Sequence, residues 1–142
     1  MKKDSQMKKI LLSSLAVVGL AYAKPYTQAD RILDMQTMAQ AMQDIQSGFF
    51  YNNLDIVKAG VEDLENTIVK IGPTQEELLS KDIYEKWMNN NTAMTHRIQN
   101  NIKARAKTIA ERFASGDPVQ ALQEYSKITR ECMKCHVSLR KW

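Results

Sequence analysis

Two cysteines and a histidine near the end of the chain have the spacing of a haem attachment site. Cys132 and Cys135 are separated by two residues, and His136 follows directly, in the sequence Cys-Met-Lys-Cys-His. Two thiols at this spacing can form thioethers with the two vinyl groups of one haem, and the adjacent imidazole can reach the iron. On a helix all three side chains project to the same side. We therefore predict one covalent haem c, held by Cys132 and Cys135, with His136 as an axial ligand.

Other uses of the two cysteines fit the pattern less well. A disulfide between Cys132 and Cys135 would strain a regular helix, because the geometry of their Cα atoms opposes it. A thioredoxin-like redox pair needs a βαβ context, and the sequence shows little strand signal. A zinc site needs four ligands, and only His96 could complete the set. His96 could also compete for the iron, but we expect an exposed or otherwise satisfied side chain there.

The elements that must position this motif are helices. Apolar residues recur every three or four positions in four segments, which is the spacing of amphipathic helices. Four such helices with mostly short connections predict an all-α fold, an antiparallel up-down four-helix bundle. The haem would then be attached near the C-terminus of the fourth helix. The four segments are about 29–50, 54–71, 84–115 and 118–139.

Capping residues indicate where these helices begin and end. Thr27 or Asp30 can cap the first helix, and Gly72-Pro73 is expected to end the second. Gly116-Asp117-Pro118 supplies in turn a C-cap, an N-cap and the first position of the fourth helix. Residues 74–83 are polar, and we expect a loop there with one helical turn at most.

The position of His136 also predicts what faces it across the iron. The histidine lies six residues from the end of the chain, so it belongs near one end of the fourth helix. In an up-down bundle the start of the first helix lies at that same end. The inward stripe of that helix carries Met35, Met38 and Met42, and a thioether is a good axial ligand that raises the haem potential. We expect Met35 to be the ligand and the other two to be adaptable core packing.

The first 23 residues have the composition of a secretory signal. Four lysines precede an apolar run at 10–20 that is too short to span a bilayer comfortably. The Ala-Tyr-Ala sequence at 21–23 offers a cleavage site. We expect export to the periplasm, no stable membrane insertion after cleavage, and one folded domain over residues 24–142. An uncleaved N-terminal anchor is the alternative.

The charge of the predicted mature chain is close to zero. Residues 1–23 hold four of the 20 basic and one of the 16 acidic residues, which leaves a net charge of +1 over 24–142. This balance excludes the basic footprint that nucleic-acid binding needs. Partner choice must then depend on local patches, and Lys134, Arg140 and Lys141 could form a small positive rim at the haem edge.

The chain resembles the cytochrome c′ family over nearly all of residues 27–141. The resemblance is carried by the haem motif followed by Leu139 and Arg140, by the stretch 117–130, by the region near Trp87, and by Arg31-x-x-x-Met35. A methionine at that helix-one position implies the low-spin, six-coordinate branch of the family. Leu139 departs from the aromatic residue common there. The resemblance also implies that Arg31 and Arg140 lie near the haem propionates.

A haem with both axial positions filled suits one-electron transfer, so we expect an electron carrier with redox partner proteins and no enzymatic activity. The main alternative is a high-spin protein that binds nitric oxide or carbon monoxide at the distal face. A weaker alternative is a copper-binding protein that uses the methionines and cysteines, because soft ligands select copper(I). Aromatic residues 49–51 could form a homodimer interface, but we expect them to plug the far end of the bundle.

Overall fold

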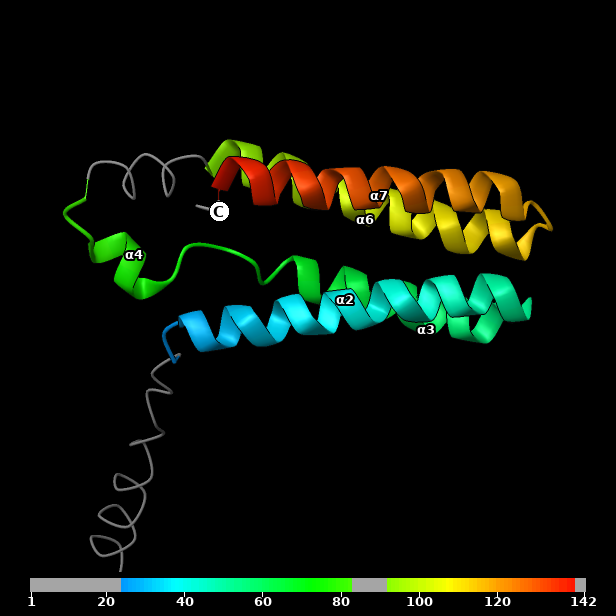
Figure 1. Cartoon of the computed structure of the whole chain (residues 1–142), viewed down its shortest axis with the longest axis horizontal. Coiled ribbons are helices and arrows are strands. Elements are labelled where there is room, and N and C mark those ends of the chain that lie inside the picture. The colour runs from blue at the N-terminus through cyan, green and yellow to red at the C-terminus, as the bar shows by residue number, and fades with distance from the viewer. Residues whose placement is uncertain (1–23, 83–91, 140–142) are drawn as a thin grey trace, which may run out of the picture.

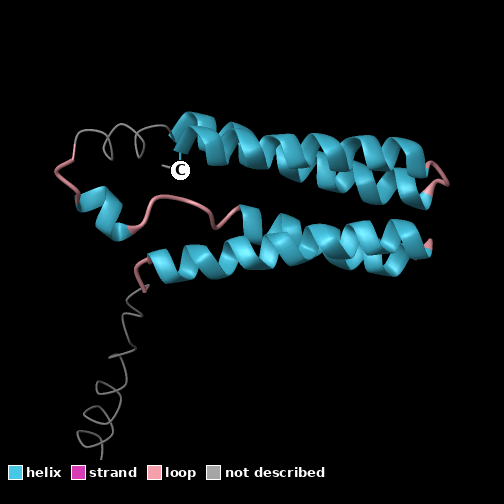
Figure 2. Ribbon diagram, viewed as in Figure 1, coloured by secondary structure: helices cyan, strands magenta, loops and turns pink. Residues whose placement is uncertain are grey.

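The structure, a computed structural model, describes residues 24–82 and 92–139. These residues form helices joined by loops and turns, without a strand, so the predicted all-α class is confirmed (Figure 2). The predicted signal at 1–23, the region near Trp87 and Arg140 lie outside the described residues. The helices are α2 (Gln28–Tyr51), α3 (Leu54–Ile68), α4 (Gln75–Leu79), α6 (Thr92–Ala114) and α7 (Pro118–Leu139).

Local side chains define the ends of these helices. The Thr27 hydroxyl accepts a hydrogen bond from the amide of Asp30, whose carboxylate accepts one from the amide of Thr27, so a capping box starts α2. The side-chain oxygen of Asn53 caps α3 by accepting hydrogen bonds from the amides of Asp55 and Ile56. Gly116, with φ of 80°, takes the left-handed conformation after α6 that glycine adopts without strain.

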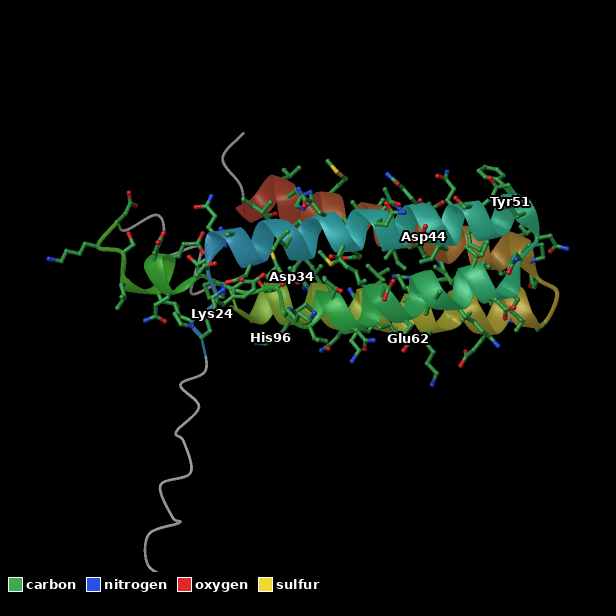
Figure 3. The ribbon with its side chains drawn as sticks, turned by 90° about the horizontal axis from the view of Figure 1, so that it is seen from below. Lys24, Asp34, Asp44, Tyr51, Glu62 and His96 are labelled. Carbon is green, nitrogen blue, oxygen red and sulfur yellow. The ribbon has the colours of Figure 1, made fainter. Side chains whose placement is uncertain are left out.

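The four long helices form two antiparallel pairs. In Figure 1, α2 and α3 make one layer and α6 and α7 the other, and successive long helices run in opposite directions. The backbone of α3 packs against α2 on one side and against α6 on the other, and α6 packs against α7. Lys24, which precedes α2, and Tyr51, its last residue, lie at the two ends of this helix in Figure 3. The fully buried aliphatic side chains come from all four helices and include Ile45, Val57, Leu64, Ile102, Ile109 and Ile128.

Helices α2 and α3 approach each other closely because a glycine stands at their contact. A methyl group added to Gly60 would lie 2.8 Å from the carbonyl oxygen of Ala41 and 2.9 Å from Cγ1 of Ile45. The absence of a side chain at this position therefore allows the two backbones to touch.

The second long helix ends earlier than its apolar spacing predicts. It stops at Ile68, with Val69 as its C-cap, although Ile71 is still buried. The side-chain amide of Gln99 in α6 donates hydrogen bonds to the carbonyl oxygens of Ile68 (2.9 Å) and Ile71 (2.7 Å). Because α6 satisfies these acceptors, the chain can leave the helix without losing hydrogen bonds. The single turn expected after it is α4.

The apolar spacing also predicts that Ile32 of α2 and Val119 and Leu122 of α7 face inward, and this prediction is wrong. Ile32 and Leu122 are about half exposed, and Val119 is 65% exposed. Both helices border a cavity, and α2 and α7 approach each other less closely than the other neighbouring pairs do.

Candidate functional site

A cavity of about 320 Å³ lies between the four long helices. Its volume is within the range of small-molecule and cofactor sites. Aliphatic residues of α3 and α6, among them Leu64, Ile68, Ile98 and Ile102, form one side. The polar groups on its wall are few, and most of them belong to Thr95, Gln99, Tyr125, Thr129 and His136.

One wall of the cavity carries the predicted attachment motif. Cys132, Cys135 and His136 all line the cavity from the last turns of α7 and are partly buried. Neither cysteine forms a disulfide. The intervening Met133 and Lys134 are exposed, so within the motif the helix turns only Cys132, Cys135 and His136 inward.

The opposite wall carries sulfur as well. Met35, Met38 and Met42 of α2 line the same cavity. Met38 belongs to the buried core, while Met35 and Met42 are partly buried and pack against it. The first turns of α2 and the last turns of α7 lie at the same end of the molecule (Figure 1). The relation of Met35 to His136 that the sequence predicts is thus compatible with the fold, and all three thioethers are within the site.

Burial keeps the first cysteine protonated. Its position in the apolar wall raises the pKa of the Cys132 thiol to about 11, and the neighbouring Cys135 adds to the shift. A thiol with so high a pKa is a poor nucleophile at neutral pH, unlike the activated cysteine of a thiol–disulfide oxidoreductase.

The cavity reaches solvent between α2 and α7. Ala39 of α2 and Thr129 of α7 line the cavity and are nevertheless exposed. We call these two residues the mouth of the cavity.

The other end of the α2–α7 pair is closed by aromatic rings. Phe49 of α2 packs against Phe113 of α6, with ring centroids 5.4 Å apart, and meets the edge of Tyr125 of α7 at 5.9 Å. Phe49 therefore plugs this end, as expected. Phe50 and Tyr51 do not, since they are 80% and 73% exposed.

The remaining predicted residues lie elsewhere. Arg31 does not line the cavity, and its guanidinium group donates hydrogen bonds of 2.7 and 2.6 Å to the carboxylate of Glu77 in α4. Arg140 lies outside the described residues. His96 is exposed on α6 and does not line the cavity.

Sequence reasoning missed Gln99, which lines the cavity and is buried. The available signal was a polar residue directly beside Ile98, in the apolar stripe of the third predicted helix. Its role depends on carbonyl groups about 30 positions away, and the spacing of apolar residues does not reveal such partners.

Comparison with protein-family models, curated proteins and solved structures finds no match to this chain. Among the described residues, no three His, Cys, Asp or Glu side chains form a group that could hold a metal ion by themselves. None of the described helices is both long and apolar enough to cross a membrane.

Proposed function

We propose that this protein is a periplasmic monohaem cytochrome of the c type that carries single electrons. One observation carries the proposal: Cys132, Cys135, His136 and Met35 line a single apolar cavity. Two thiols, an imidazole and a thioether are the groups that a six-coordinate c-type haem needs, and their convergence requires two helices from opposite ends of the chain.

The residues of the cavity would have distinct roles. Cys132 and Cys135 would tether the cofactor through thioethers, and His136 and Met35 would supply the axial ligands. The aliphatic walls would exclude water and so keep the local dielectric low, which tunes a bound redox group. The chemistry that a haem supplies in such a site is the gain and loss of one electron. Because His136 and Met35 would both bind the iron, no coordination position would be left for a substrate, and we propose no enzymatic activity.

The same proposal includes the topology of the four long helices. The antiparallel order of α2, α3, α6 and α7 supports an up-down four-helix bundle like that of the cytochrome c′ family. The composition of residues 1–23 supports export, the compartment in which a c-type cytochrome would be assembled.

Covalent haem and its spin state test the proposal. The full-length chain would be expressed with export and with the haem attachment machinery, then purified and run on a denaturing gel. We expect haem staining at the mass of the polypeptide and a low-spin spectrum in both oxidation states. A chain that emerges without covalent haem would contradict the proposed function.

Two alternatives are separated by the same measurements. A five-coordinate, high-spin spectrum with covalent haem would favour a protein that binds nitric oxide or carbon monoxide on the Met35 side. Stoichiometric copper(I) without haem would favour the copper-binding alternative, because three thioethers and two thiols face one cavity.

A further inference from the structure

The two helices that border the cavity mouth carry an uncharged stripe of exposed side chains, in which Gln43 and Gln46 of α2 stand between apolar residues. On α2, Ile32 and Phe50 lie seven and eleven residues from Ala39, which places all three within about 20° of one line along the helix. On α7, Leu122 and Met133 flank Thr129 in a similar manner. All six side chains are exposed. We call these six residues the seam.

The seam carries no charge. From Ile32 to Tyr51, the only charged residues of α2 are Asp34 and Asp44, each five positions from Ala39 and therefore about 140° round the helix. Asp34 lies on the side of α2 that faces α3 (Figure 3), where it accepts a hydrogen bond from Tyr26. The nearest charge on α7 is Arg130, which lies about 100° round the helix from Thr129 and about 60° from Met133.

The expected positive rim is weaker than the sequence suggests. Lys134 donates a hydrogen bond of 3.0 Å to the carboxylate of Glu131, which is buried. This ion pair neutralises the charge of Lys134 and holds its ammonium group beside a residue that lies off the seam. The other two residues of that rim, Arg140 and Lys141, lie outside the described residues.

We propose that the seam is the docking surface for a redox partner protein whose own docking face is apolar and uncharged. This inference depends on the proposed function, because the seam surrounds the place where the cavity reaches solvent. From Ile32 to Phe50 the stripe is about 27 Å long at 1.5 Å per residue, which suits a protein face better than a small molecule. Depletion of charge with exposed aliphatic, Met and aromatic side chains is typical of interface cores.

The occupant is a transient partner and not a permanent second copy. A carrier must accept an electron from one protein and deliver it to another, and a copy fixed on the seam would cover the mouth in both encounters.

Electron-transfer rates of the haem-loaded protein test this assignment. The probes are two small blue-copper proteins, one with an uncharged apolar docking face and one with an acidic face. We expect the rate constant with the apolar-faced probe to change less than about threefold between low and high salt, since no long-range charge steers the encounter. Ile32→Lys and Leu122→Lys should each lower it about tenfold by placing a charge in the interface core.

Leu33→Lys is the matched control. Leu33 is an exposed aliphatic neighbour of Ile32 on the same helix turn, but it faces about 120° away from Ala39. The same charge there should change the rate less than twofold. Equal losses in Ile32→Lys and Leu33→Lys would overturn the proposal, as would a faster, steeply salt-dependent reaction with the acidic-faced probe.

Three further outcomes would also contradict it. A stable dimer in sedimentation that Ile32→Lys dissociates would assign the seam to a second copy. If duroquinol reduces Ile32→Lys more slowly than Leu33→Lys, while neither probe protein distinguishes these two variants, the seam would be assigned to a small lipophilic molecule. If the haem-loaded, low-spin protein shows equal rates for Ile32→Lys and Leu33→Lys, only this inference is contradicted. A protein without haem would contradict the proposed function itself.

Discussion

The guanidinium group of Arg31 and the carboxylate of Glu77 form a bidentate ion pair, although they lie 46 positions apart in the chain. Glu77 also accepts a hydrogen bond from the amide of Thr74, so one carboxylate both caps α4 and joins it to the start of α2. The amide of Gln75 adds a second link to the carbonyl oxygen of Tyr26. The short helix α4 is thus fastened to the start of α2.

This ion pair predicts a loss of stability in acid. Burial alone would raise the pKa of the Glu77 carboxyl, but hydrogen bonds from Arg31 and Thr74 outweigh it and hold the pKa below its usual range. The contribution is therefore complete above the unfolded pKa of about 4.3 and is lost as the pH falls through the lower folded value. We expect Glu77→Gln to lower the free energy of unfolding by about 1 kcal/mol at pH 7.

Chemical denaturation across pH 2–7 would measure this effect. The gap between Glu77→Gln and the unchanged protein should close once the pH lies below the folded pKa. Glu76→Gln, at an exposed position of the same short helix, is the control. A gap that persists unchanged at pH 2 would mean that the ion pair is not its source.

The axial assignment predicts different results at two methionines of one wall. Met35→Ala should convert the low-spin spectrum of the loaded protein into a high-spin one, because the sixth ligand is removed. Met38→Ala should keep the low-spin spectrum but lower the free energy of unfolding by about 2–3 kcal/mol, since Met38 lies in the core. The reverse pattern in the absorption spectra would transfer the ligand role to Met38.

The attachment motif predicts a graded loss of covalent haem. Cys132→Ala and Cys135→Ala should each leave one thioether, so that the intact mass still includes one haem. The double variant should lose haem on a denaturing gel, while native preparations could still retain it through the axial ligands. Intact-mass measurement under denaturing conditions separates these cases. Haem that stays attached in the double variant would show that the thiols are not its anchors.

Gln99 provides a stability prediction that needs no cofactor. Gln99→Leu fits the apolar surroundings but removes one donor from the carbonyl groups of Ile68 and Ile71. The Ile68 carbonyl keeps its hydrogen bond from the amide of Ile71, so the cost falls mainly on the Ile71 carbonyl. We expect a loss of about 1–3 kcal/mol in the free energy of unfolding. Asn100→Leu, at the next and exposed position, should stay within about 0.5 kcal/mol of the unchanged protein in the same urea titration.

Gly60 and Gly72 form a matched pair for helix packing. A methyl group at Gly60 meets the backbone of α2, so we expect Gly60→Ala to destabilise by about 2 kcal/mol despite the higher helix propensity of alanine. At Gly72 nothing lies within 4 Å of an added methyl group, and the change should be close to neutral. Thermal unfolding of both variants checks this, and a neutral Gly60→Ala would show that α2 and α3 can separate at little cost.

The helices could be predicted well because their signals are local. Thr27 with Asp30 and the Gly116-Asp117-Pro118 sequence specify ends through contacts within a few residues, and the structure uses both. Residues that act across the chain could not be found in this way. The burial of Ile32 depends on whether α7 covers it, and its sequence spacing alone does not contain that fact.

The candidate site shows the same division. Cys132, Cys135 and His136 are close in sequence, so their shared side of one helix could be predicted. That Met35, Met38 and Met42 also face them depends on two helices from opposite ends of the chain, and antiparallel order made this foreseeable. The pairing of Arg31 with Glu77 could not be predicted, because the resemblance pointed to the cofactor and no local pattern points to α4.

The rings of Phe49, Phe113 and Tyr125 have a consequence for the order of assembly. They close the molecule at the end away from the thiols. The side chains of Ile45, Val57, Ile109 and Ile128 in that half are completely buried by the polypeptide itself. We expect that half to form as soon as the chain is free to fold. The thiol-bearing half has an apolar cavity to fill, so it would remain the looser of the two until attachment is complete. Hydrogen exchange before and after loading should then slow most in α2 and α7 near the cavity, and least beside Phe49.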